Sequence, residues 1–520
     1  MGVAAVAALS MVSCNDFLDE PSRTQLTEEQ IYGNVETAEK SLVALYKDWR
    51  DLWAGHNFYY LSNGTDEIQN GAYQALKEGG GYNGAIDRFD ALLTSDHEYV
   101  TNCWNWRWPK ISEAAKIINA LEPKVSTDER ARKVWAEVSF IRGSLMMDMT
   151  MIYGKIPVID LANIVELGTR RQDLTTIWTY IISDLTNSAN NAPDKNDPGR
   201  ITKYAALMLL GYAYMAAPEE TGLRDFAKAE ECLRQVVQGP FSLVPYYDLF
   251  DYNTPNTSEA IYEFQFNTTW PDNNGNQFMV GSRAAASMGG DACYFAGYDH
   301  AVPTPWAYSD VEDGGIWEEG DIRKEESIRY DFEWNGKNAV DYIPGLSWEG
   351  LSPEDQDECL PHIKKYEDYR TDRYSGMGIN NMWNSGKDIP WLRLGNAYLL
   401  YAECLNELNR TAEAVDWVND VRARAWDFDI PDEMLWKSGM SQNDFREQIM
   451  TERVRELFGE RWRRFDLVRT GKFYELVKER NKWAKRSGTI QPWNVIWPIP
   501  MSEIEQNLEI DFSDQNEGYI

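Results

Sequence analysis

The sequence predicts a mainly α protein, in which tetratricopeptide-like helix pairs form a right-handed scaffold with a long loop-rich, partly β insertion. Three observations predict this fold. Apolar residues recur at three- and four-residue steps in many segments of the 520-residue chain, as in amphipathic helices. Two segments, 203–238 and 391–425, each read as two helices joined by a short polar turn. Residues 258–388 lack the helical period and are rich in Gly, Asp, Asn and aromatic residues.

The first thirty residues read as an export signal followed by a tether. Val3–Val12 is an apolar run too short to cross a membrane, and its length is typical of a signal-peptide core. Met11–Cys14 resembles a bacterial lipobox, in which cleavage leaves a cysteine that carries lipid. We therefore expect a signal peptide at 1–13, truncated at its start, and a lipid-bearing Cys14 that opens a polar tether at 14–30. These features predict a protein that is anchored to a membrane by lipid rather than one that spans it.

Residues 31–257 form the expected N-terminal helical part. Gly154 fits a helix stop, and Thr202 fits an N-cap. Residues 54–95 read as loops, and the GGGYNG run at 79–84 follows no strand, so we reject nucleotide binding there. The helices expected from apolar spacing are 34–53, 98–121, 127–153, 172–192, 203–217 and 226–238.

Residues 258–388 are the expected insertion, and residues 389–520 complete the same domain. The alternation of 259–266 predicts a strand at the start of the insertion. A long aperiodic run inside a compact protein is usually functional, so we expect the ligand face there. The helices expected after the insertion are 391–408, 411–425 and 443–472.

The last of these helices is unusually charged, because ten of the eighteen residues in 452–469 are ionic. Two interpretations are open. The helix is either solvated and laced with i,i+4 ion pairs, or it turns Arg461 and Arg464 inward to tie the end of the chain to the rest of the fold. Arginine suits the second role because its guanidinium group bonds carboxylates or carbonyls in pairs.

Four segments carry a resemblance to a known family. The run ERVRELFGERWRRFDLVRTGK at 452–472 resembles the C-terminal signature of the SusD/RagB family. The blocks at 198–206, 391–425 and 495–519 resemble other parts of the family pattern, although Asn396 replaces its usual Asp. Members of this family are lipid-anchored outer-membrane proteins that capture nutrients, mostly glycans, for a partner TonB-dependent, SusC-like transporter.

The resemblance implies a surface-exposed lipoprotein of the cell outer membrane that binds oligosaccharides and delivers them to that transporter without catalysis. Two alternatives remain open. The protein is otherwise a secreted glycoside hydrolase whose carboxylate dyad lies in the insertion, or a protein-binding helical-repeat scaffold without sugar affinity.

A glycan site needs flat aromatic faces, with amide, carboxylate or guanidinium groups that bridge hydroxyls. The resemblance implies that the site is shared between the loops after the first helices and the insertion. We assign Trp104 and Trp108, four residues apart on a helix, to the core. The candidate site residues are the aromatics Tyr73, Tyr82, Trp106, Tyr294, Tyr298, Trp306 and Trp317, with Asp66, Asn83 and Arg283 as hydrogen-bonding partners.

The composition restricts the classes of ligand and cofactor that we expect. A formal net charge of −32 repels nucleic acid and acidic polysaccharide alike, and it favours neutral glycans. The six cysteines are scattered without a CxxC, and the four histidines, His56, His97, His300 and His362, are far apart in the chain. We therefore expect neither a metal nor a cofactor, and the chain contains no nucleophile, metalloprotease or P-loop motif.

Overall fold

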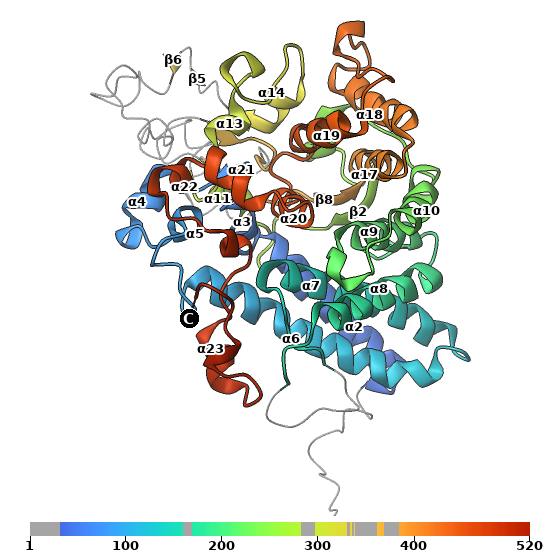
Figure 1. Ribbon diagram of the computed structural model, residues 1–520. Coiled ribbons are helices and arrows are strands. Elements are labelled where there is room, and N and C mark those ends of the chain that lie inside the picture. Colours follow the sequence, from blue (N-terminus) through green and yellow to red (C-terminus); the bar gives the residue numbers. More distant parts are fainter. Residues whose placement is uncertain are drawn as a thin grey trace, which may run out of the picture.

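The computed structural model describes residues 32–159, 169–281, 297–329, 333–334, 337–338, 361–368 and 384–519, and these are mainly helical (Figure 1). The longer helices are α2 (Val35–Arg50), α6 (Glu98–Leu121), α7 (Glu129–Tyr153), α8 (Leu174–Asn191), α9 (Lys203–Ala216), α10 (Phe226–Val237), α17 (Leu394–Glu407), α18 (Thr411–Ala425) and α19 (Gln442–Leu457). Shorter helices are α3 (His56–Ser62), α4 (Ala72–Leu76), α5 (Ala85–Arg88), α11 (Asn276–Met279), α13 (Pro305–Tyr308), α14 (Arg323–Ser327), α20 (Arg463–Arg469), α21 (Phe473–Arg480), α22 (Lys482–Ser487) and α23 (Met501–Gln506).

The N-terminal helices agree with the sequence expectation to within three residues, because their signals are local. The Thr202 hydroxyl accepts a hydrogen bond from the Ala205 N–H at 3.3 Å, which confirms the N-cap of α9. Gly154 ends α7 with a φ of 71°, a conformation that glycine adopts without steric cost.

The helices stack as a row. Each of α6, α7, α8, α9 and α10 packs against the next along the chain, and α10 then packs against α17, which pairs with α18. Figure 1 shows α8, α9, α10 and α17 following one another up one side of the molecule. Such a row is what stacked helix pairs require, and it places α10 beside α17 although the whole insertion separates them in sequence. The mainly α fold is thus confirmed, whereas the right-handed twist of the scaffold stays a prediction.

The insertion opens and closes with one antiparallel strand pair. The strand predicted at 259–266 is β2 (Ala260–Phe264), and it pairs with β8 (Ile389–Arg393). This pairing corrects the expectation of a helix from 391, because residues 389–393 bond to β2 and α17 begins only at Leu394. The remaining described strands form three two-stranded pairs: β1 (Ile68–Gln69) with β3 (Val302–Pro303), β4 (Ile328–Arg329) with β7 (His362–Ile363), and β5 (Glu333–Trp334) with β6 (Lys337–Asn338).

The helix predicted over 443–472 is two helices, α19 and α20, joined by a turn. Gly459 and Arg461 have φ values of 72° and 68°, which interrupt the helix. Both inward-facing arginines are confirmed: Arg461 donates to the Leu52 carbonyl at 2.9 Å and Arg464 to the Val495 carbonyl at 3.0 Å. Burial lowers the pKa of each guanidinium to about 10. The interpretation as a solvated helix is therefore wrong.

Glu452 and Glu456 of α19 lie in a buried ion cluster, which we call the Glu456 cluster. Glu456 itself contacts Arg323, Arg393 and Arg424, and its side chain is fully buried. Burial raises the pKa of Glu456, but the guanidinium groups around it outweigh burial and hold that pKa well below its usual range. The cluster joins six cations, Arg323, Lys365, Arg393, Arg422, Arg424 and Arg455, to six carboxylates, Glu259, Glu318, Asp321, Glu452, Glu456 and Glu460.

We expect Arg393→Met to lower the unfolding midpoint in urea strongly. The substitution leaves Glu259, Glu456 and Glu460 without a shared cation, and removal of one partner of a buried pair costs about 3–5 kcal/mol. The matched control is Arg130→Met, which breaks an exposed pair with Glu39 and should barely move the midpoint. An Arg393→Met protein as stable as the control would contradict a structural role for the cluster.

Candidate functional site

Strands β1 and β3 bring the loops after the first helices against the insertion. Ile68 pairs with Pro303, and the Gly71 N–H donates to the Asp299 carbonyl at 2.8 Å. The two backbones are so close at Gly71 that a Cβ there would lie 2.6 Å from the Cβ of Asp299, so only glycine fits. The two regions that the sequence analysis expects to share a site are therefore in contact, and the site itself stays a prediction.

Five of the candidate residues belong to these loops and to the start of α6, and we call them the loop face: Tyr73, Tyr82, Asn83, Trp106 and Tyr298. The Gln74 side chain joins the two regions. Its amide nitrogen donates to the Tyr298 carbonyl at 3.1 Å, and its oxygen accepts from the Asn83 amide at 2.8 Å. Tyr82 stacks on His97 with a centroid distance of 4.3 Å.

A continuous run of ring contacts connects Trp106 to Tyr298. The centroid distances are 5.6 Å from Trp106 to Tyr60, 4.9 Å from Tyr60 to Tyr59, 4.7 Å from Tyr59 to His300 and 5.7 Å from His300 to Tyr298. The inner rings are buried, whereas Tyr298 is 39% exposed and Trp106 is half-buried. The run therefore holds its two ends in fixed positions while each keeps surface for a ligand.

Sequence reasoning missed the supporting residues Tyr59, Tyr60 and His300. The only signal for Tyr59 and Tyr60 is the aromatic run HNFYYLS at 56–62, which lies in a segment that reads as a loop and folds as the short helix α3. His300 lies in the insertion, and the sequence shows only that it is far along the chain from the other histidines.

Two polar candidates differ in how much they can offer a ligand. Asp66 is fully buried and accepts two hydrogen bonds of 2.6 Å from Arg463, with Arg480 at 3.1 Å. These guanidinium groups outweigh burial and lower the pKa of Asp66. Asp66 thus anchors its loop to α20, in contrast to Asn83, which is half-buried at the loop face.

Two of the remaining candidates are described, and the others lie outside the described residues. The Arg480 guanidinium lies 4.0 Å from the ring centroid of half-buried Trp306. Trp317 is a core residue, 1% exposed, whose indole N–H donates to the Ala307 carbonyl at 2.8 Å, so its burial argues against ligand contact. Trp104 is in the core as expected, and Trp108 packs against it. Cys14, Arg283 and Tyr294 lie outside the residues that the structure describes.

Glu67 fastens the loop that carries the site to the turn between α19 and α20. Its carboxylate accepts a hydrogen bond of 2.7 Å from the Gly459 N–H, and its side chain is buried. Burial raises the pKa of Glu67 to about 8, although the Gly459 bond and nearby Arg463 act in the opposite direction. The loop is therefore held by a carboxyl group that favours its protonated form.

The histidines and acidic residues of the described part are the candidates for metal binding or catalysis. Within them, no group of three His, Cys, Asp or Glu side chains is placed to hold a metal ion. His56 and His300 are far apart in sequence, but their ring centroids lie 5.6 Å apart. Glu318 and Asp321, which sequence proximity pairs, are bonded to arginines of the Glu456 cluster. Among the helices that the structure describes, none combines the length and the apolar character needed to cross a membrane.

Solved structures with this architecture are SusD-like proteins. A laminarin-binding SusD-like protein superposes with a TM-score of 0.72, covering 93% of this chain and 99% of its own at 23% identity. Surface glycan-binding protein A from Bacteroides fluxus superposes with a TM-score of 0.71, covering 93% and 99% at 19% identity. These likenesses define the fold as that of a SusD-like protein.

The chain belongs to the SusD family, since residues 254–519 match that family. Residues 16–215 match a second family, described as starch-binding associating with outer membrane. A SusD-like protein of Formosa agariphila is 27% identical over 98% of this chain and 97% of its own length. The starch-binding protein SusD of Bacteroides thetaiotaomicron is 26% identical over 76% and 74%. The resemblance seen in the sequence is thus confirmed.

We expect Glu67→Gln to stabilise the protein increasingly as the pH rises. The folded pKa of about 8 lies above the ordinary value of 4.5, so the stability that the protonated carboxyl contributes is complete below pH 4.5 and is lost as the pH rises through 8. Glutamine keeps the Gly459 bond without a charge. Thermal unfolding midpoints of the two proteins should diverge between pH 4.5 and about pH 8 and stay apart above it; a pH-independent gap would contradict the assigned shift.

Proposed function

We propose that this protein binds neutral oligosaccharides on the loop face and delivers them to a TonB-dependent, SusC-like transporter of the outer membrane, breaking no bonds. The run of rings from Trp106 to Tyr298 carries the proposal. It supplies aromatic surfaces in fixed positions, and buried Gln74 ties Tyr298 to the half-buried Asn83 amide. A pyranose needs both a flat apolar partner and hydrogen bonds to its hydroxyls, which the rings and Asn83 would provide.

The relatives support the class of ligand. One solved structure with this fold is named as laminarin-binding, and a relative of similar sequence is named as starch-binding. Laminarin and starch are neutral glucans, and the net charge of −32 also favours an uncharged polymer over an acidic one. Tyr294 and Arg283 stay in the proposal because Gly281 and Gly297, which flank their segment, lie against each other next to Tyr298.

The place of action follows from the sequence and from the family. Cys14 in its lipobox-like setting would carry the lipid, and the tether at 14–30 would let the folded part stand outside the outer membrane. In this arrangement the transporter supplies the passage and the protein supplies the capture, so the protein has to bind, hand over and release.

We expect the double variant Tyr298→Ala/Trp106→Ala to weaken glucan binding at least tenfold, equivalent to about 1.4 kcal/mol, because both ends of the ring run lose their stacking surface. Isothermal titration calorimetry with laminarihexaose and maltoheptaose measures this, and the samples are then examined for cleavage. Phe428→Ala is the control, because Phe428 is 54% exposed and lies outside the loop face.

Each other result points elsewhere. Full affinity in the double variant would place the glycan site outside the loop face. Cleavage of either sugar would mean a glycoside hydrolase, and the absence of binding by the native protein would leave a scaffold that binds only protein.

We expect Cys14→Ala to release the protein from the outer-membrane fraction, because an unacylated chain has no anchor. Immunoblots of membrane and soluble fractions measure the distribution, with Cys103→Ala as the control, since Cys103 is buried in the folded part. A Cys14→Ala protein that still sediments with the outer membrane would contradict the lipid anchor.

A further inference from the structure

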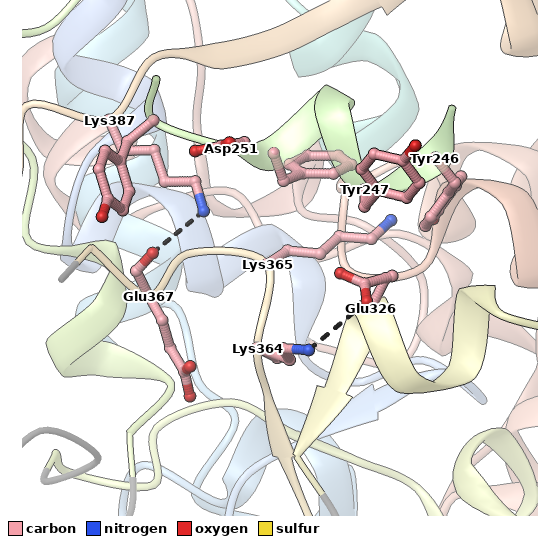
Figure 2. Close-up of a pocket in the computed structure, with 10 residues that line it drawn as sticks. Tyr246, Tyr247, Asp251, Glu326, Lys364, Lys365, Glu367 and Lys387 are labelled. Carbon is pink, nitrogen blue, oxygen red and sulfur yellow. Dashed lines mark hydrogen bonds and ion pairs between the residues drawn. The ribbon is translucent and has the colours of Figure 1, made fainter. Parts of the chain in front are cut away.

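A cavity of about 270 Å³ lies beside the short helix η7 (Tyr246–Phe250), and none of its lining residues belongs to the loop face. Figure 2 shows η7 along one side and lysines of the segments next to β7 and β8 along the other. Ligand pockets usually start at about 300 Å³, so this cavity suits a small ligand unit. We call it the Tyr247 pocket, after the ring that is most open to solvent.

Contacts with the Glu456 cluster fix the aromatic side of the pocket. Tyr246 is fully buried, and its hydroxyl donates to the Glu456 carbonyl at 3.0 Å. The Lys365 ammonium lies 4.5 Å from the centroid of the Phe250 ring and is held there by Glu460 at 2.7 Å. Tyr247, the next residue after the buried Tyr246, is 50% exposed. The pocket therefore offers one accessible ring on a rigid floor.

The polar side combines donors and acceptors in balance. The Lys364 ammonium donates to the Glu325 carbonyl at 2.9 Å and lies 3.8 Å from Glu326, and the Lys387 ammonium donates to the Glu367 carbonyl at 3.0 Å. Asp251 and Glu326 contribute two carboxylates to the same cavity. The carboxylate of Glu367, which also lines the cavity, is paired with Arg329, and Lys365 is paired within the Glu456 cluster. The ammonium groups of Lys364 and Lys387 thus face the carboxylates of Asp251 and Glu326.

The balance between ammonium and carboxylate groups favours an uncharged ligand that both donates and accepts hydrogen bonds. A sugar hydroxyl both donates and accepts, so it bonds an ammonium and a carboxylate side by side, and the C–H face of the same ring stacks on a tyrosine. An anionic ligand would meet Asp251 and Glu326 in a chain whose net charge is −32, and a cationic one would meet the lysines. A neutral saccharide can bond to both kinds of group without adding a charge to the pocket.

We propose that the Tyr247 pocket is a second saccharide site, which takes one or two units of a neutral glycan by stacking on Tyr247 and bonding to Asp251 and Lys364. Its ligand class rests on the proposed function, but its residues are separate from the loop face. A chain that holds a glycan at two places gains residence time over one that holds it at a single place, because the second contact is intramolecular.

The test removes the two loop-face rings and measures the glycan binding that remains. The Tyr298→Ala/Trp106→Ala protein is titrated with laminarihexaose and maltoheptaose, and contacts are mapped by saturation-transfer difference NMR. Residual binding is expected, and Tyr247→Ala added to this background should weaken it at least tenfold. Tyr247→Phe should restore it because stacking needs no hydroxyl, whereas Asp251→Asn should weaken it several-fold. Phe428→Ala is the control for the loss of an exposed ring.

The outcomes separate the two proposals. Residual binding that ignores Tyr247→Ala, or no residual binding at all, overturns the second site and leaves the loop face standing. Native binding that ignores the loop-face substitutions but falls with Tyr247→Ala supports the pocket and overturns the loop face. The absence of binding by the native protein overturns both. Thermal unfolding of each variant shows that a loss is not a loss of fold.

Discussion

The fold depends on the charge balance inside the Glu456 cluster. A buried carboxylate or guanidinium is costly unless opposite charges and hydrogen bonds surround it, so α19 can dock only when its glutamates meet their arginines. Those arginines come from α14, β8 and α18, and Glu259 joins from the residue before β2. One cluster therefore holds both ends of the insertion, the second helix pair and the C-terminal helices together. Arg323 and Arg393 each contact three of its carboxylates, so the loss of either leaves several buried acidic groups without a shared cation.

Both proposed sites are fixed to this cluster or to the turn that follows it. The loop with Asp66 and Glu67 is held by Arg463 and by the Gly459 N–H, and this loop carries the strand that positions Tyr298. At the other site, Tyr246 bonds to the carbonyl of Glu456. The rings that would meet a ligand are thus mounted on a rigid interior, which reduces the entropy lost when a glycan binds.

The motifs that resemble the SusD family pattern can be compared with the parts of the structure that they build. The motifs at 391–425 and 452–472, which resemble the family pattern, build the second helix pair and supply Arg393, Arg424 and Glu456 to the cluster, whereas the loop face lies outside those motifs. The two proposed sites use similar side chains, a tyrosine together with an amide or a carboxylate, but these side chains lie on unrelated segments of the chain.

The sequence by itself determined most of the longer helices, because helix formation is governed by apolar spacing and capping over a few residues. Helices α6, α9 and α18 begin where those signals place them, whereas α3 lies in a segment that reads as loops. It also determined the family, through motifs that can be read without coordinates. Only the tertiary structure decided the environment of each candidate. Residues 389–393 became a strand because β2 lies beside them, and Asp66 and Trp317 became buried although their residue types suit a sugar site. Burial and pairing depend on segments hundreds of residues away, and no local pattern records them.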